Sequence, residues 1–552
     1  MDVRMIVAFV LIGLIILAMP LYQRYVLRRV EERPFRVSEV ERETDEGVEE
    51  EGGRIEKEER HDAGISPVIV GEKREAAASG ERFVPQEVVV ENELFRGVIS
   101  TEGGTIRRWQ LKRFRSADRV GDVELVGEGV IGGGIWITDG IGRYDLTRAE
   151  FSPDVERLDL VGDEIGEVRF VWRVGSRRVE KAFHFKGDRY DFKMVVRLAG
   201  FEGNVDCAVG WEGGILPTEA NVREDVGYTK VYTYMGGEME SYDEKKGKPL
   251  SVEVEGRLEW ACVRNKYFVV ALIPSDGEIS KLRAEGEVEE DLGHKRFDMW
   301  VEQDVGDDGV FESRVYVGPL KYEVVSKLGV ELERTMLGGW KWIQPIMLPI
   351  RKLVVRILLG LRRVIPNYGV VIIVFSILVK VVLYPLTRKS RQATLKMQRL
   401  QPELAKLREK YQGDREGLNR ATMRLYKEHG ANPVGGCFPM LLQMPILIAL
   451  FTVFRNTIEF RQAEFISWWI SDLSLPDRTL ILPVLMGVTM FIQQKMTMKD
   501  PKQAAMVYVM PAVMIFLFRT FPAGLVLYYT MFNILSLVEQ VVMVKRSGRE
   551  IA

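Results

Sequence analysis

The side chain best placed to do chemistry in this sequence is a cation that lies inside an apolar segment. Lys380 lies between two valines, where a charge costs about 2.5–3.5 kcal/mol on membrane-insertion scales. No Asp or Glu occurs from 366 to 402, so its own helix offers no partner. We expect Lys380 to be an unpaired cation in a wet cavity, where it attracts acidic groups. The alternative is that its side chain snorkels to the interface near Pro385.

Enzyme chemistry finds no support among the other reactive residues. The sequence has four histidines but no HExxH or CxxC pattern, and the glycines at 132–134 lack the strand–GxGxxG–helix context of a dinucleotide site. Cys207 and Cys262 could pair, but free buried thiols are favoured, and Cys437 has no thiol nearby. The sequence therefore predicts no catalytic residue, no metal site, no cofactor and no small-molecule substrate.

Six hydrophobic segments must position Lys380 in a membrane. The first, residues 5–21, is an uncharged run of 17 that ends in a basic cluster instead of a small-residue cleavage site. We therefore expect a retained transmembrane anchor over residues 1–28. The other five lie near 369–386, 437–454, 479–494, 505–519 and 522–544. Because several are short or contain polar residues, they favour a five-helix bundle with a polar interior over residues 366–547.

Two segments without long apolar runs separate the anchor from the bundle. Residues 29–80 read as an acidic flexible linker, since 31–62 hold 14 acidic and 6 basic side chains. From 81 to 330 apolar residues alternate with polar ones between glycine-rich turns. This pattern predicts a large antiparallel β-sandwich on one side of the membrane. The expected fold is thus mixed, a polytopic α-helical bundle with a β-sandwich domain.

Residues 336–365 predict an amphipathic helix between these two parts. Seven apolar residues follow one helical face, namely Ile350, Leu353, Val354, Ile357, Leu358, Leu361 and Val364. Lys352, Arg356 and Arg363 lie on the other face. Such a helix suits the membrane interface, with Trp340 and Trp342 as anchors at headgroup level. Packing against the following bundle is the alternative.

Residues 388–430 predict a basic helical hairpin, with 12 basic and 5 acidic side chains. Apolar residues repeat every three or four positions from Met397 to Tyr411, and Asp414 is placed to cap a second helix that ends at Gly430. The candidate contact residues are Arg399, Lys406, Arg408, Lys410 and Arg424. Such a hairpin could meet lipid headgroups or ribosomal RNA, or it could be a solvated structural element.

Charge asymmetry predicts the orientation. The hairpin, the loop after 494 and the C-terminal tail contain 18 basic residues, whereas the intervening segments on the opposite side contain 4. By the positive-inside rule, the hairpin and both termini are cytoplasmic and the β-domain is outside.

Several long strings resemble the YidC-type insertases, relatives of the mitochondrial Oxa and chloroplast Albino insertases. In the core these are YPLT (384–387), KMQRLQPELAKLREKY (396–411), LYKEHGANPVGGCFPMLLQMPI (425–446), FRQAEF (460–465), ILPVLMGVTMFIQQKM (481–496) and FPAGLVLYY (521–529). The β-domain resembles the family's periplasmic domain more weakly, through 92–111 and 266–274.

The resemblance implies a hydrophilic groove that is open to cytoplasm and lipid and closed outward. Lys380 occupies the position where the family usually has an arginine; it keeps the charge but loses the bidentate fork. The polar residues that could line this groove are Ser376, Gln443, Tyr529 and Asn533. Ordinary interhelical hydrogen bonding is the alternative role for them.

The expected function is a membrane protein insertase and chaperone, not an enzyme, in the cell inner membrane with six spans. Its partners would be nascent membrane proteins, the ribosome, the Sec translocon and the lipid bilayer. A transporter or channel with a periplasmic ligand-binding domain is the alternative, although no internal repeat supports it. An anchored carbohydrate-binding protein would leave the five-span core unexplained.

Overall fold

The computed structural model describes residues 68–70, 84–244, 248–274, 279–289, 294–306, 308–336, 344–430, 438–497 and 504–549. All of them belong to one compact unit, Ser66–Ala552. The predicted anchor, nearly all of the acidic linker, Trp340, Trp342 and Cys437 lie outside the described residues.

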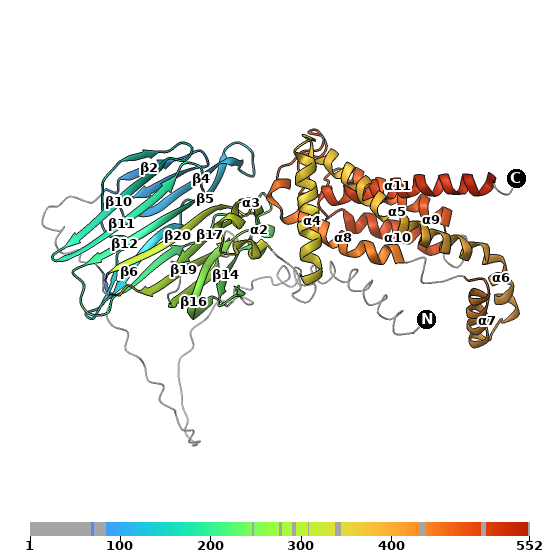
Figure 1. Ribbon diagram of the computed structural model, residues 1–552, viewed down its shortest axis with the longest axis horizontal. Helices are drawn as coiled ribbons and strands as arrows, with labels where there is room; N and C mark the ends of the chain where they lie inside the picture. Colours follow the sequence, from blue (N-terminus) through green and yellow to red (C-terminus); the bar gives the residue numbers. More distant parts are fainter. Residues whose placement is uncertain are drawn as a thin grey trace, which may run out of the picture. The chain divides into compact units, whose positions relative to one another are not determined.

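The first part of the described chain is a β-domain whose strands form two sheets (Figure 1). One sheet contains β1 (Val68–Val70), β2 (Glu87–Glu91), β3 (Phe95–Ser100), β4 (Thr105–Arg115), β5 (Asp122–Val126), β6 (Ile131–Thr138), β7 (Arg143–Asp145), β9 (Arg157–Asp159), β13 (Asp206–Glu212), β18 (Ile279–Glu289) and β19 (His294–Asp304). The other contains β8 (Ser152–Pro153), β10 (Ile165–Val174), β11 (Arg177–Lys186), β12 (Asp191–Ala199), β14 (Lys230–Met235), β15 (Glu238–Tyr242), β17 (Phe268–Pro274) and β20 (Val310–Pro319).

One long strand joins the two sheets. The first half of β16 (Leu250–Arg264) pairs with β18, and the second half pairs with β14 and β17. Pairing is antiparallel except between β1 and β7 and between β2 and β9. This large antiparallel-rich domain confirms the prediction from period-two alternation.

Aromatic side chains from both sheets meet in the core of the β-domain. Trp109 on β4 stacks on Phe95 with ring centroids 3.9 Å apart, and its ring also lies 5.5 Å from Phe192 on β12. Burial of such large apolar side chains is the main favourable contribution to folding. Cys207 and Cys262 are free buried thiols, as the sequence favoured.

A lysine is fully buried within this core. The Lys181 ammonium donates hydrogen bonds to the carbonyls of Gly103 (3.2 Å), Gly104 (2.6 Å) and Gly133. All three glycines have positive φ, which lets their turns aim carbonyls inward. Burial lowers the pKa of Lys181 to about 7, while three acceptors match the three N–H bonds of its charged form.

Replacing Lys181 with methionine should destabilise the β-domain by about 2–4 kcal/mol, because three buried carbonyls lose their donor. Between pH 7 and the ordinary pKa of 10.5, the unfolded chain keeps a proton that folded Lys181 loses. The wild-type stability therefore gains a component that rises with pH, and Lys181→Met should remove it. Hydrogen exchange of β4, β6 and β11 in the intact protein would measure both effects. Lys186→Met, at an exposed position of the same strand, is the control.

The second part of the chain is helical. Short helices α2 (Val222–Tyr228), α3 (Tyr322–Val325), η2 (Ser326–Leu328) and η3 (Leu332–Met336) belong to or follow the β-domain. Then come α4 (Gln344–Arg362), α5 (Tyr368–Arg399), α6 (Gln401–Lys410), α7 (Arg415–Glu428), α8 (Phe438–Asn456), η4 (Ile458–Phe460), α9 (Ile481–Thr497), α10 (Ala504–Phe518) and α11 (Ala523–Arg549).

Helices α5, α8, α9, α10 and α11 form a bundle (Figure 1). Its core contains Phe375 of α5, Leu450 of α8, Met486 of α9 and Tyr528 of α11. Figure 1 shows α4 running across the direction of these helices. The apolar face of α4 is divided, since Val354 and Leu358 are buried whereas Leu353 is 56% exposed. The helix therefore packs on the bundle and still presents apolar surface.

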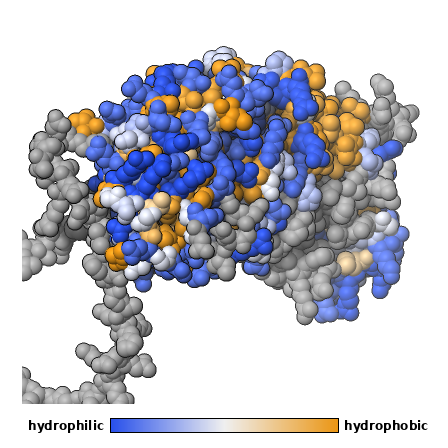
Figure 2. All heavy atoms as spheres, turned by 60° about the vertical axis from the view of Figure 1, so that its left-hand side comes forward, coloured by the Kyte–Doolittle hydropathy of each residue, from blue (hydrophilic) through white to orange (hydrophobic). Residues whose placement is uncertain are grey.

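Two of the described helices, Tyr368–Pro385 and Ala523–Val542, are long and apolar enough to cross a membrane. Ile481–Met496 and Val507–Phe518 are apolar but shorter. In Figure 2 hydrophobic surface gathers at the right of the view, over the helices, whereas the β-domain in front is largely hydrophilic. The five-span core remains a prediction.

The hairpin begins differently from the prediction. Helix α5 runs without a break from the apolar segment to Arg399, because 386–399 contains good helix formers and no proline. The break falls at Leu400, since Pro402 has no N–H and its ring excludes a preceding helical turn. The predicted cap is confirmed, for the Asp414 carboxylate accepts from the Gly417 N–H at 2.8 Å.

Candidate functional site

Lys380 is buried at the contact between α5 and α11, with 8% of its surface exposed. Its ammonium lies 3.2 Å from a carboxylate oxygen of Glu539 and donates to the Ser536 hydroxyl at 2.6 Å. It also lies 4.5 Å from the centroid of the Phe532 ring. The expectation of an unpaired cation was therefore wrong. The partner is on another helix, 159 residues along the chain.

The contacts of Lys380 explain why its charge is tolerated inside the protein. A buried charge is tolerated only when it is paired and hydrogen-bonded, and removing one partner typically costs 3–5 kcal/mol. Glu539 supplies the opposite charge, Ser536 supplies an acceptor, and the face of Phe532 attracts a cation. Another carboxylate in the place of Glu539 would form the same ion pair with Lys380. Such an exchange is therefore close to neutral in free energy.

The other predicted groove residues are spread over the bundle. Ser376 is fully buried, and its hydroxyl donates to the carbonyl of Ile372 on its own helix. Asn533 is 7% exposed, and its Nδ2 has no hydrogen-bond partner among the described residues; the same holds for Nε2 of Gln443 on α8. The half-buried ring of Tyr529 lies 5.4 Å from that of Phe518. Their role as a groove lining remains a prediction.

Three contact residues of Lys380 were missed as site candidates. Phe532, Ser536 and Glu539 recur at i, i+4 and i+7 and so share one face of α11. Glu539 is the only acidic residue inside the later apolar segments, and it lies near the end of the last of them. The heptad spacing was the signal that could have found the group.

The hairpin presents its basic side chains to solvent. Arg399, Lys406, Lys410 and Arg424 are exposed, and Arg408 is half-buried. Among the seam residues whose side chains the structure describes, from Leu400 to Tyr411, Leu400 and Leu404 are buried. The hairpin is therefore a charged surface with a small core of its own.

The segment between α8 and α9 is bonded to the β-domain. The side chain of Arg461 is 2% exposed, and its Nε lies 2.6 Å from Glu219. Its other nitrogens donate to the carbonyls of Arg115 (2.8 Å) and Thr218 (3.2 Å). Burial raises the pKa of Glu219, although Arg461 beside it acts in the opposite direction.

A second buried ion pair lies in the same contact. Glu224 accepts from Lys266 at 2.9 Å and from Arg455 at 3.1 Å. Despite burial, these two cations hold the pKa of Glu224 below its usual range. Around this contact the β-domain contributes Glu219, Glu224, Asp225 and Lys266, and the helical part contributes Arg455 and Arg461. The net charges of the two sides are thus opposite and equal.

Comparisons with known proteins address both parts of the chain. Residues 360–550 match the family described as 60Kd inner membrane protein, and residues 87–350 match the YidC periplasmic domain. The membrane protein insertase YidC of Chlorobium luteolum is 33% identical over 495 residues, which is 84% of this chain and 83% of that protein. The YidC insertase of Chlorobium phaeovibrioides is 35% identical over 515 residues, 86% of each chain.

A solved structure also matches along most of the chain. A crystal structure of an active YidC insertase with its first transmembrane domain resolved covers 83% of this chain and 92% of its own, with 20% identity and a TM-score of 0.37. The identity and coverage of the relatives decide the family. This chain belongs to the YidC family of membrane protein insertases, inner-membrane proteins with a periplasmic domain.

Proposed function

We propose that the helical core inserts client segments through a site centred on Lys380. The observation that supports this is the buried Lys380–Glu539 pair between the two helices that are long enough to span the bilayer. A paired charge inside such a bundle is costly to maintain without a use. Ser376, Gln443, Tyr529 and Asn533 would line a groove around it.

In this proposal, an acidic residue of the client exchanges with Glu539. At 4 Å a client carboxylate gains up to about 4 kcal/mol from Lys380 at an effective dielectric of 20. Because Glu539 gives up the same attraction, the exchange offsets the client's cost only as far as the released Glu539 regains its hydration. Glu539 can move towards water when released, because it lies near the end of the apolar part of α11, which Lys545 and Arg546 follow. Lys380 thus attracts the client without being left unpaired between clients.

The remaining topology follows the charge pattern. We place five spans in α5, α8, α9, α10 and α11, a sixth in residues 5–21, and both termini in the cytoplasm. The hairpin then lies in the cytoplasm, where its exposed basic residues meet the ribosome or lipid headgroups. Clients arrive from the ribosome or from the Sec translocon.

Photo-crosslinking of a ribosome-bound client tests the site. A photoreactive residue at Leu383, one turn from Lys380 and half-buried, should crosslink to the client segment. The same residue at Val382, which is 64% exposed, should crosslink mainly to lipid. Equal client crosslinking at both positions would contradict a groove on the Lys380 side of α5.

Removing residues 395–428 and closing the gap with a short linker should leave the bundle folded but impair insertion. The reason is that Leu400 and Leu404 are the buried apolar residues among the described side chains of 399–428, so loss of the hairpin exposes little apolar surface. Thermal melting of the purified protein and an insertion assay would measure the two effects. A collapse in melting temperature would show that the hairpin is structural.

A further inference from the structure

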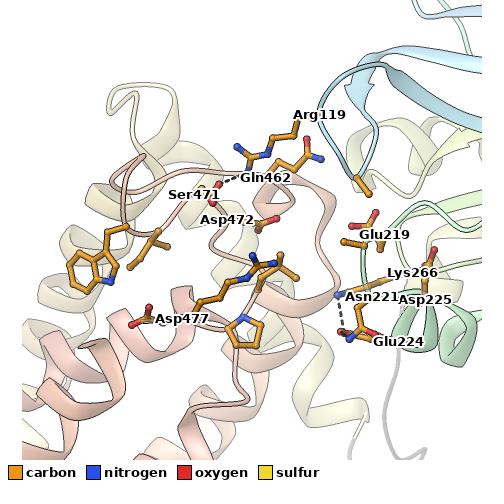
Figure 3. A pocket seen from close by; sticks show the side chains of 17 residues that line it. Arg119, Glu219, Asn221, Glu224, Asp225, Lys266, Gln462, Ser471, Asp472 and Asp477 are labelled. Atoms are coloured by element: carbon orange, nitrogen blue, oxygen red, sulfur yellow. Dashed lines mark hydrogen bonds and ion pairs between the residues drawn. The ribbon is translucent and has the colours of Figure 1, made fainter. Parts of the chain in front are cut away.

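A polar cavity of about 200 Å³ lies between the β-domain and the segment before α9 (Figure 3). From the β-domain come Arg119, Glu219 and Lys266, and from the segment come Trp469, Asp472 and Arg478. The cavity differs from the proposed insertion site in place and in chemistry. It is built from charges of both signs, on the periplasmic side of the bundle.

Most of these charges already have partners. Lys266 is paired with Glu224, Glu219 with Arg461, and Arg119 with Glu464. Four lining groups have no ion pair among the described residues, namely Asp225, Asp472, Asp477 and Arg478. The Asp225 carboxylate already accepts hydrogen bonds from the amides of Thr218 and Lys266 within the β-domain. Asp472 accepts from the Ser474 N–H and hydroxyl through Oδ1, which leaves its Oδ2 without a partner in the described part of the chain. Asp477 is 4% exposed, and both of its oxygens are engaged: Oδ1 accepts from the Thr479 N–H and hydroxyl, and Oδ2 accepts from the amide of Leu482 at the start of α9.

Two features favour a position of the cavity at the level of lipid headgroups. Directly after Arg478, α9 exposes an apolar strip with 40–47% exposure at Ile481, Val484, Leu485, Val488 and Ile492. This i, i+3, i+4 spacing follows one helical face and is suited to acyl chains. Trp468 is 82% exposed, and Trp469 lines the cavity. Tryptophan is enriched at that depth of the membrane.

We propose that this cavity binds the headgroup of a zwitterionic aminophospholipid, with its acyl chains along the exposed strip of α9. The ammonium donates to Oδ2 of Asp472, and the phosphate accepts from the Arg478 guanidinium. A purely anionic headgroup would place its charge beside two carboxylates. A choline headgroup has no N–H to donate. The open carboxylate oxygen of Asp472 and the Arg478 cation, which has no ion pair among the described residues, therefore select phosphatidylethanolamine.

Native mass spectrometry of the full chain with single lipids of matched acyl chains tests this. We expect phosphatidylethanolamine to be retained about fivefold more than phosphatidylcholine or phosphatidylglycerol, as suits one exposed charge pair. Arg478→Gln and Asp472→Asn should each remove that preference, whereas Arg478→Lys should keep most of it. The control variants are Arg519→Gln, an exposed cation at the turn before α11, and Asp188→Asn, an exposed carboxylate of the β-domain.

Three results would overturn the proposal. They are equal retention of the three lipids, an unchanged preference in Arg478→Gln together with Asp472→Asn, or the same loss in the control variants. Free phosphoethanolamine distinguishes the source of the headgroup. It should not displace the lipid at equal concentration, because it lacks the acyl chains; displacement would assign the cavity to a soluble ligand instead.

Discussion

Replacing Lys380 with methionine is expected to reduce insertion of clients with acidic external tails about tenfold. The change leaves the Glu539 carboxylate buried without its partner and removes the charge that attracts the client. Lys380→Arg should keep activity, because arginine keeps the charge and adds a second hydrogen bond to a carboxylate. Lys380→Glu should be the most damaging variant, since it faces Glu539 with a like charge.

The matched variant is Glu539→Gln. Glutamine can still accept a hydrogen bond from Lys380, but it does not compete as an anion. Insertion of the acidic client by Glu539→Gln should therefore be kept or increased. If the pair served only to stabilise the bundle, Glu539→Gln would reduce insertion as much as Lys380→Met does.

Protease protection of the client's external tail in reconstituted vesicles measures this effect. The same client with its acidic residues neutralised should be inserted similarly by wild type and Lys380→Met. Equal insertion of the acidic client by wild type and Lys380→Glu would remove Lys380 from the mechanism.

The large elements of the fold follow from local patterns. Period-two alternation predicted the β-domain, and five apolar segments coincide with α5, α8, α9, α10 and α11. Asp414 was recognised as a cap because its partner, the Gly417 amide, is three residues away. The break at Leu400 was missed because the apolar seam continues across it, although Pro402 removes a backbone N–H and favours a kink or a break there.

Pairings between distant segments could not be predicted in this way. The partners of Lys380 lie on α11, and which face of α11 meets α5 depends on packing of the whole bundle. Arg461 was counted only as one of four basic residues on the outer side, yet it is buried against Glu219, 242 residues earlier. A sequence pattern shows that a charge is costly, but the fold decides which opposite charge stabilises it.

Arg461→Met is expected to weaken docking of the β-domain on the segment between α8 and α9 by about 3–5 kcal/mol. The substitution leaves the Glu219 carboxylate buried without its cation and deprives the carbonyls of Arg115 and Thr218 of their donor. Hydrogen exchange of residues 218–228 and 457–463 in the intact protein should accelerate by about two to three and a half orders of magnitude, the factor that corresponds to this loss. The fold of each part should persist, because both parts have their own hydrophobic cores.

Two further variants distinguish the effect of leaving Glu219 buried without its cation from a general weakening of the contact between the two parts. Adding Glu219→Leu to Arg461→Met should restore part of the protection, because it removes the unpaired carboxylate. Arg119→Met breaks the exposed pair with Glu464 in the same contact and should cost no more than about 1 kcal/mol. If Arg119→Met accelerated exchange as much as Arg461→Met, the buried guanidinium would not be the group that fixes the β-domain to the insertase core.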